Sequence, residues 1–127
     1  MKYTLAILCA LSITGLTHAA DLSSGDKQFL TGYEKIRVAL ASDDLDAAKK
    51  AAAGLPAASD IAGSKDLGAA RAAFEKLTPQ AEKLSAGQAG YHVYHCSMAN
   101  KDWVQSATDV GNPFLGKDMA GCGEVKQ

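Results

Sequence analysis

Long apolar runs, an excess of charge of one sign and paired cysteine motifs are all missing from most of this sequence. After residue 16 no apolar stretch is long enough to cross a bilayer, so no membrane anchor is expected in the rest of the chain. The sequence has no C-x-x-C, which argues against a structural zinc site, and no C-x-x-C-H, which argues against covalent haem. Large core side chains are few, because alanine dominates the central segments. A cross-link or a bound metal would therefore matter more here than in a protein with a larger core.

The first 19 residues have the pattern of a secretory signal peptide. Lys2 gives a basic start, residues 3–16 are almost uncharged, and small residues precede a polar segment. The apolar run is too short to span a bilayer, and cleavage is expected after Ala19. Cys9 and His18 would leave with this peptide. The remaining chain is expected to be exported, to the periplasm or out of the cell.

Residues 20–127 are predicted to form a single domain, since their number is typical of one hydrophobic core. Without Lys2 they carry 12 basic and 14 acidic side chains. This near balance argues against nucleic acid and against anionic membrane surfaces as partners. Two cysteines remain, Cys96 and Cys122, and in an oxidising compartment a disulfide between them must be considered before any metal.

Apolar residues recur at steps of three and four through most of this domain, which predicts helices. One helix is expected over residues 21–43 with a serine cap, and a second over residues 43–53, which Gly54 and Pro56 stop. Residues 57–64 are ambiguous and could hold one turn of helix. A third apolar stripe follows these segments along the chain.

This third stripe extends from Leu67 to Leu84 and contains Pro79. Because the stripe keeps its phase across the proline, one kinked helix is favoured over two separate ones. The alternative is that Thr78 and Pro79 are the N-cap and first position of a new helix.

Glycines at 87 and 90 end the helical part of the chain. Aromatic and β-branched residues at 91–96 and 103–104 then predict a short hairpin, residues 111–113 a turn, and residues 115–120 one turn of helix. The expected fold class is therefore mainly α, a small antiparallel helical bundle with a short C-terminal β-hairpin and loop arm.

Every cysteine, histidine and methionine beyond the predicted signal peptide lies in two short segments near the C-terminus. These residues are His92, His95, Cys96, Met98, Met119 and Cys122. Thiolate, thioether and imidazole are the ligands that copper(I) prefers, with silver(I) as a natural mimic. Calcium and magnesium require oxygen ligands, and zinc usually uses paired cysteine and histidine motifs. The cluster therefore predicts a soft-metal site.

The spacing of these residues gives partial geometry. In a strand, His92, Cys96 and Met98 would share one face while His95 points to the other. In a helix, His92 and Cys96 would again share a face, because they are four residues apart. Met119 and Cys122 are three residues apart, so one helical turn would bring them together.

Other interpretations of the same residues need no metal. Cys96 and Cys122 could form a disulfide that closes a loop of about 25 residues and stabilises the fold by about 3 kcal/mol. The reduced pair could bind a metal, whereas the oxidised pair could not. Methionine more often fills a core than binds a metal, and a histidine is usually a surface residue. No oxyanion site or substrate pocket is marked, so enzymatic activity is not expected.

Four segments of the last third carry a family resemblance: Tyr94–Ala99, Trp103, Gly111–Met119 and Gly121–Val125. They are similar to the signature of a bacterial periplasmic family, the domain of unknown function numbered three-three-four-seven. The pattern of that family is roughly C-P-M-A, W-L, R-N-P-Y-F-G and M-x-x-C-G-E. The alanine-rich helices are also similar, so the likeness extends over nearly all of residues 20–127. This chain departs from the pattern with Ser97 for proline, Gly111 for arginine and Phe114-Leu115 for the aromatic pair.

The family occurs alone and attached to adaptor subunits of heavy-metal efflux pumps, so the resemblance implies copper or silver handling. It places the main ligands at Cys96, Met98, Met119 and Cys122 and leaves the two histidines auxiliary. The expected protein is a periplasmic copper buffer or chaperone in heavy-metal resistance, with an efflux-pump adaptor or a cuproprotein as its partner. The alternative is a disulfide-stabilised helical interaction domain without metal.

Overall fold

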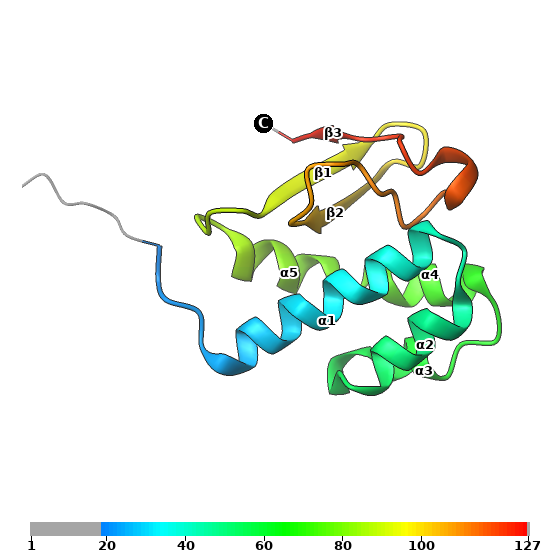
Figure 1. The fold of residues 1–127 in the computed structure, drawn as a ribbon, viewed down its shortest axis with the longest axis horizontal. Coiled ribbons are helices and arrows are strands. Elements are labelled where there is room, and N and C mark those ends of the chain that lie inside the picture. Colours follow the sequence, from blue (N-terminus) through cyan, green and yellow to red (C-terminus); the bar gives the residue numbers. More distant parts are fainter. Residues whose placement is uncertain (1–18, 127) are drawn as a thin grey trace, which may run out of the picture.

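The structure, a computed structural model, describes residues 19–126, which form five α-helices and one three-stranded antiparallel sheet (Figure 1). The expected predominance of helix is confirmed. The predicted signal peptide lies outside the described residues except for Ala19, and Cys9 and His18 lie outside them too. Among the described helices, none combines the length and apolarity that a membrane crossing needs.

The first two helices lie where the apolar periodicity predicts them. Helix α1 (Ser24–Ala41) begins after Ser23, whose hydroxyl accepts from the Asp26 amide while the Asp26 carboxylate accepts from the Ser23 amide. Helix α2 (Leu45–Ala53) is capped by Asp44 and ends at Gly54. The predicted stripe of α1 is buried, so this helix turns one apolar face to the core.

The third stripe forms two helices, so the prediction of one kinked helix is wrong. After η1 (Pro56–Ala58) and α3 (Ser59–Ala62) come α4 (Leu67–Glu75) and α5 (Thr78–Ser85). Pro79 has no amide hydrogen to donate to the carbonyl of Glu75 four residues earlier, and its ring crowds that carbonyl. Helix α4 ends at Glu75 for this reason. The apolar phase persists because both helices pack on the same core.

The sheet has strand order β2-β1-β3 and is antiparallel throughout. Strand β1 (His92–Cys96) pairs with β2 (Lys101–Gln105), with Tyr94 opposite Trp103. It also pairs with β3 (Glu124–Val125), a strand that the sequence did not predict. A 3-10 turn, η2 (Lys117–Met119), lies within the range expected to hold one turn of helix. Strand β1 is therefore the central strand, with β2 on one side and the C-terminal β3 on the other.

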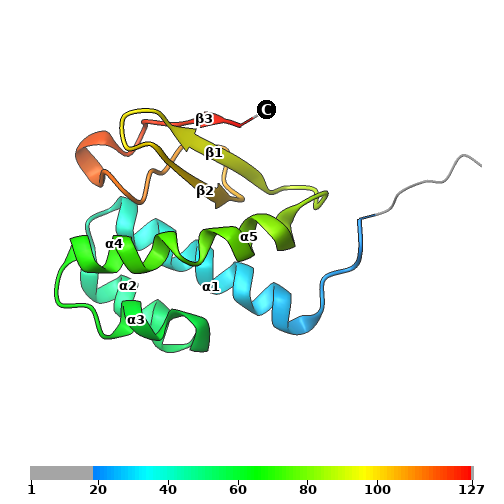
Figure 2. The same cartoon turned by 180° about the vertical axis from the view of Figure 1, so that it is seen from behind.

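The elements stack in layers, with α1, α4 and α5 between the sheet and the pair α2 and α3. The two views of Figures 1 and 2 agree on this order. Aromatic rings fill the space between helices and sheet: Tyr33 stacks on Phe74 at 4.4 Å between centroids, and Trp103 lies 5.7 Å from Tyr94 and 6.4 Å from Phe114. The hydroxyl of Tyr33 contacts Thr78 and accepts from the Val104 amide. Burial raises the pKa of Tyr33, so this hydroxyl stays protonated and can hold α5 and β2 together.

Residues 106–126 are here called the C-terminal arm. Two arginines of the helices, Arg37 and Arg71, bind the backbone of this arm. Arg37 is only 3% exposed and donates from Nη1 to the carbonyl of Gly111 at 2.7 Å, while its other nitrogens bind Glu34. Arg71 donates from Nε to the carbonyl of Pro113 at 2.8 Å and from Nη2 to Asp43. The first half of the arm is therefore fixed by charged groups of the helices.

Acid is expected to weaken the Asp43 attachment. The Arg71 guanidinium and the Lys117 amide hold the pKa of the Asp43 carboxyl below its usual value of about 4. A depressed folded-state pKa stabilises the fold at pH values above the unfolded pKa, and this contribution is lost as the pH falls through the folded pKa. Melting temperatures measured from pH 6 to pH 3 should therefore fall less for Asp43→Asn than for the wild type. Asp60→Asn, at an exposed site, should follow the wild type, and equal slopes for all three proteins would refute the assignment.

Candidate functional site

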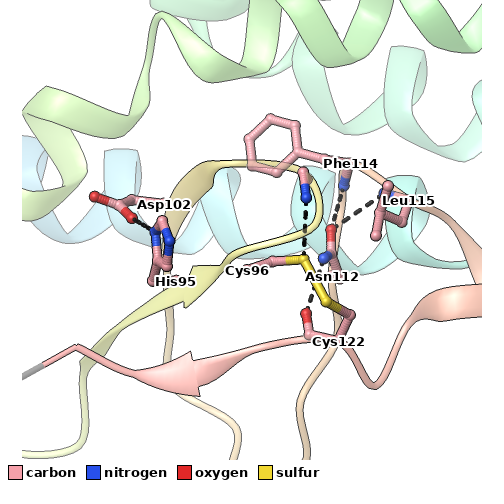
Figure 3. Close-up of a disulfide and its surroundings, with 8 residues drawn as sticks. His95, Cys96, Asp102, Asn112, Phe114, Leu115 and Cys122 are labelled. Carbon is pink, nitrogen blue, oxygen red and sulfur yellow. Dashed lines mark hydrogen bonds and ion pairs between the residues drawn. A yellow bond between two sulfur atoms is a disulfide. The ribbon is translucent and has the colours of Figure 1, made fainter.

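A disulfide between Cys96 and Cys122 forms the centre of the candidate site (Figure 3). It connects the end of β1 to the arm just before β3, with 5.7 Å between the two Cα atoms and a sequence separation of 26. Closing a loop of this size stabilises a fold by about 3 kcal/mol. The sequence left open whether the two cysteines form a disulfide or a reduced, metal-binding pair. The structure has the disulfide, in which neither sulfur is a thiolate.

The two sulfurs have different surroundings. Cys96 is 1% exposed because strand alternation turns it, with Tyr94, toward the helices. Its Sγ accepts from the amide of Ala99 at 3.4 Å across the turn between β1 and β2. Cys122 is only partly buried, in the arm. Cys96 thus lies in the core, whereas Cys122 packs against the core and is partly open to solvent.

Asn112 holds the arm around Cys122 and is a residue that sequence reasoning missed. Its side chain is fully buried, donates from Nδ2 to the Cys122 carbonyl at 2.8 Å, and accepts at Oδ1 from the amides of Phe114 and Leu115 (Figure 3). Its own amide donates to the Ala120 carbonyl at 2.8 Å. The segment 111–113 was expected to be only a turn. The available signal was asparagine itself, whose side chain bonds to amides two or three residues later.

Both methionines of the candidate set are exposed. Met98 is 70% exposed and Met119 is 39% exposed, so neither fills the core. Met98 follows the end of β1 and lies in the turn, where strand alternation no longer applies. Met119 ends η2, and its carbonyl accepts from the Cys122 amide at 3.0 Å. The structure therefore puts one flexible thioether near each sulfur along the chain, two residues after Cys96 and three before Cys122.

The histidines are not gathered around the disulfide. His92 lies exposed at the other end of β1 from Cys96, about 13 Å away for a strand of this length, which is too far for both side chains to bind one ion. His95 points to the opposite face from Cys96, and its Nδ1 lies 2.6 Å from Oδ1 of Asp102 on β2. Within residues 19–126, no group of three or more His, Cys, Asp or Glu side chains is arranged to hold a metal ion.

An open groove of about 890 Å³, here called the disulfide groove, extends from the disulfide to α4 and α5. Its lining includes both cysteines and an excess of acidic over basic side chains. The charged members are Glu75, Glu82, Asp102, Glu124, Lys101 and Lys126, with His95 beside them. Lys101 pairs with Glu75 at 2.6 Å, and Lys126 pairs with Asp102. The groove therefore attracts cations, because carboxylates outnumber ammonium groups.

The ion pairs in this groove alter two pKa values. Partial burial of Asp102 opposes its ionisation, but hydrogen bonds with Lys126 and His95 outweigh burial and hold the pKa of this carboxyl below its usual value. The same contact raises the pKa of Lys126. Asp102 thus remains a carboxylate that links β2, β1 and the arm at neutral pH.

Comparison of the chain with family models, with curated proteins and with solved structures found no match. A functional assignment has to be argued from the chemistry of the site itself.

Proposed function

We propose that this protein binds copper(I) through Cys96 and Cys122 once their disulfide is reduced, and that it buffers or delivers the metal in the periplasm. Silver(I) would bind in the same way. The observation that carries the proposal is the disulfide, which holds the two cysteines 5.7 Å apart at Cα with an exposed thioether close to each along the chain. Two thiolates supplemented by thioethers are a donor set suited to a soft, low-coordinate cation.

The ligands would be Cys96, Cys122, Met98 and Met119. The Ala99 amide that now donates to the Cys96 sulfur would also stabilise a thiolate there. Both methionines are exposed, so their flexible side chains are free to turn toward the metal. His95 is held by Asp102 and His92 is distant, which leaves both as auxiliary residues.

The rest of the fold would serve as a scaffold. We interpret the helices as a small antiparallel bundle that holds the hairpin of β1 and β2, and thus Cys96, in place. The arm brings Cys122 to it. The excess of carboxylates in the disulfide groove would favour the approach of a cation, and a pump adaptor or a cuproprotein would be the exchange partner.

A titration of the two redox forms tests this proposal. Reduced protein is expected to retain copper(I) against a chelator at micromolar competition, whereas the oxidised form retains none, because a disulfide offers no thiolate. Fluorescence of Trp103, the single tryptophan, provides a readout alongside metal analysis. If the reduced protein releases all its copper to the chelator, the proposal is wrong.

A second candidate is a disulfide-stabilised interaction domain without metal. The burial of Cys96, at 1% exposure, favours it, because a permanently bonded cysteine needs no access. Mass spectrometry of protein taken directly from its native compartment separates the two. A uniformly oxidised pair that resists mild reductant and carries no metal would support this second candidate.

A further inference from the structure

The two sulfurs of the disulfide differ in how an incoming thiol can reach them. Thiol–disulfide exchange requires a thiolate to approach one sulfur in line with the bond that breaks. Cys96 is 1% exposed and packed in the core, whereas Cys122 is partly exposed in the arm. Both line the disulfide groove, which opens to solvent beside them. Attack is therefore sterically favoured at Cys122.

Cys96 is the better leaving group of the two cysteines. When Cys122 is attacked, the bonding electron pair departs on the sulfur of Cys96. That sulfur already accepts the Ala99 amide at 3.4 Å, and a hydrogen bond to the charged form stabilises a thiolate. Access and leaving-group stability thus select the same direction of attack.

The arm remains attached after this bond breaks. The side chain of Asn112 donates to the carbonyl of Cys122 at 2.8 Å. Beyond Cys122, β3 pairs with β1, and the Lys126 amide donates to the Val93 carbonyl at 2.8 Å. Both sulfurs therefore stay close together when reduced. Such proximity allows the bond to form again without refolding.

The charge of the groove selects among thiols. Within residues 19–126, the carboxylates of Glu82 and Glu124 have no ion-pair partner, whereas both lysines of the groove are already paired. A thiol that carries a positive charge is attracted by this field, and one that carries a negative charge is repelled.

We infer that Cys122 is a site of mixed-disulfide formation with cationic thiols, and that this reaction switches the pair between its oxidised and reduced forms. The external thiolate forms a bond with Cys122 Sγ, the Cys96–Cys122 bond breaks, and Cys96 leaves as a thiolate. A second external thiolate then displaces Cys122 and departs as the external disulfide, so two thiols are oxidised while one protein disulfide is reduced. The inference rests on the proposed function only in taking the reduced pair as the copper-binding form.

Peptide mapping after a short reaction with cysteamine identifies the attacked sulfur. Free thiols are alkylated, and trypsin separates the two cysteines into residues 84–101 and 118–126. We expect the cysteamine adduct on Cys122 and the alkyl group on Cys96. An adduct mainly on Cys96, or equal amounts on both, would overturn the inference.

If the bond closes too quickly for the adduct to accumulate, the single-cysteine variants decide. Cystamine should modify Cys122 in Cys96→Ser at least about tenfold faster than Cys96 in Cys122→Ser, because exchange rates follow access to the sulfur. Equal rates, or a faster reaction at Cys96, would again refute the assignment. Neither experiment contains copper, so their failure is distinguishable from a failure to bind the metal.

The charge selection is tested with thiols of different charge. Rates for cysteamine, mercaptoethanol and mercaptoethanesulfonate are each divided by the rate of the same thiol with a neutral small disulfide. The corrected rates should fall in that order by about tenfold overall at low ionic strength and converge at 1 M salt. Glu124→Gln should narrow the range, whereas Asp46→Asn, the same charge change on α2, should not. Equal corrected rates at low salt would disprove the selection.

Discussion

Replacing either cysteine with serine is expected to weaken copper(I) binding by reduced protein by at least about 100-fold, or about 2.7 kcal/mol. A serine hydroxyl is a hard, neutral ligand and cannot substitute for a thiolate on a soft cation. The loss should be similar for Cys96→Ser and Cys122→Ser, because a site that uses one cysteine of β1 and one of the arm loses half its thiolates in each variant. Competition against a copper(I) chelator under reducing conditions measures the change.

Methionine and histidine variants measure how much each remaining candidate ligand contributes to copper(I) affinity. Met98→Leu and Met119→Leu keep the size of the side chain and remove only the thioether, so a smaller loss of about tenfold is expected from each. Exchange of His92 or His95 for glutamine should change little, since His92 lies at the other end of β1 and His95 is bound to Asp102 on the opposite face of the strand from Cys96. If Cys122→Ser retained the wild-type affinity, Cys122 would have no part in the site and the proposed pair of thiolates would be wrong.

Asn112→Ala is expected to destabilise the oxidised protein by about 3–4 kcal/mol. The side chain makes three hydrogen bonds, to the Cys122 carbonyl and to the amides of Phe114 and Leu115. Alanine leaves these backbone groups without partners, and each group left unpaired in a buried position costs about 1–3 kcal/mol. Urea unfolding of oxidised protein gives the free energy directly.

The control for this measurement is Gln80→Ala, which truncates an exposed amide on α5 and should change stability by less than about 0.5 kcal/mol. Asn112→Asp keeps the acceptor oxygen but sets a second oxygen against the Cys122 carbonyl and buries a carboxyl group, so at neutral pH its loss should be at least as large as that of Asn112→Ala. A loss for Asn112→Ala no larger than that of the control would mean that the disulfide and β3 hold the arm without it.

The helices were the most predictable part of the fold, because their evidence is local. Capping residues and apolar spacing in α1 and α2 are read within a few positions of the chain. The break between α4 and α5 was misjudged because apolar phase records which core two segments share. It does not show whether one helix continues from the first segment to the second. The missing amide hydrogen of Pro79 ends the first helix.

The site was predictable in composition and much less so in arrangement. The pairing of Cys96 with Cys122 was foreseeable as one of two states, since only these cysteines remain after the predicted signal peptide. The partner of His95 depends on strand register, which sets Asp102 opposite it, and register depends on the turn and the core together. Strand β3, with two residues, is too short to carry any periodicity.

The contact between Arg37 and Gly111 restricts which residues related sequences can have at these two positions. The guanidinium of Arg37 occupies the space that a β-carbon at position 111 would need. Only one of the two positions has room for a long side chain, so a guanidinium can extend from the helix to the arm or belong to the arm, but not both. Positions 37 and 111 should therefore co-vary among related sequences, with glycine at 111 wherever an arginine at 37 reaches the arm.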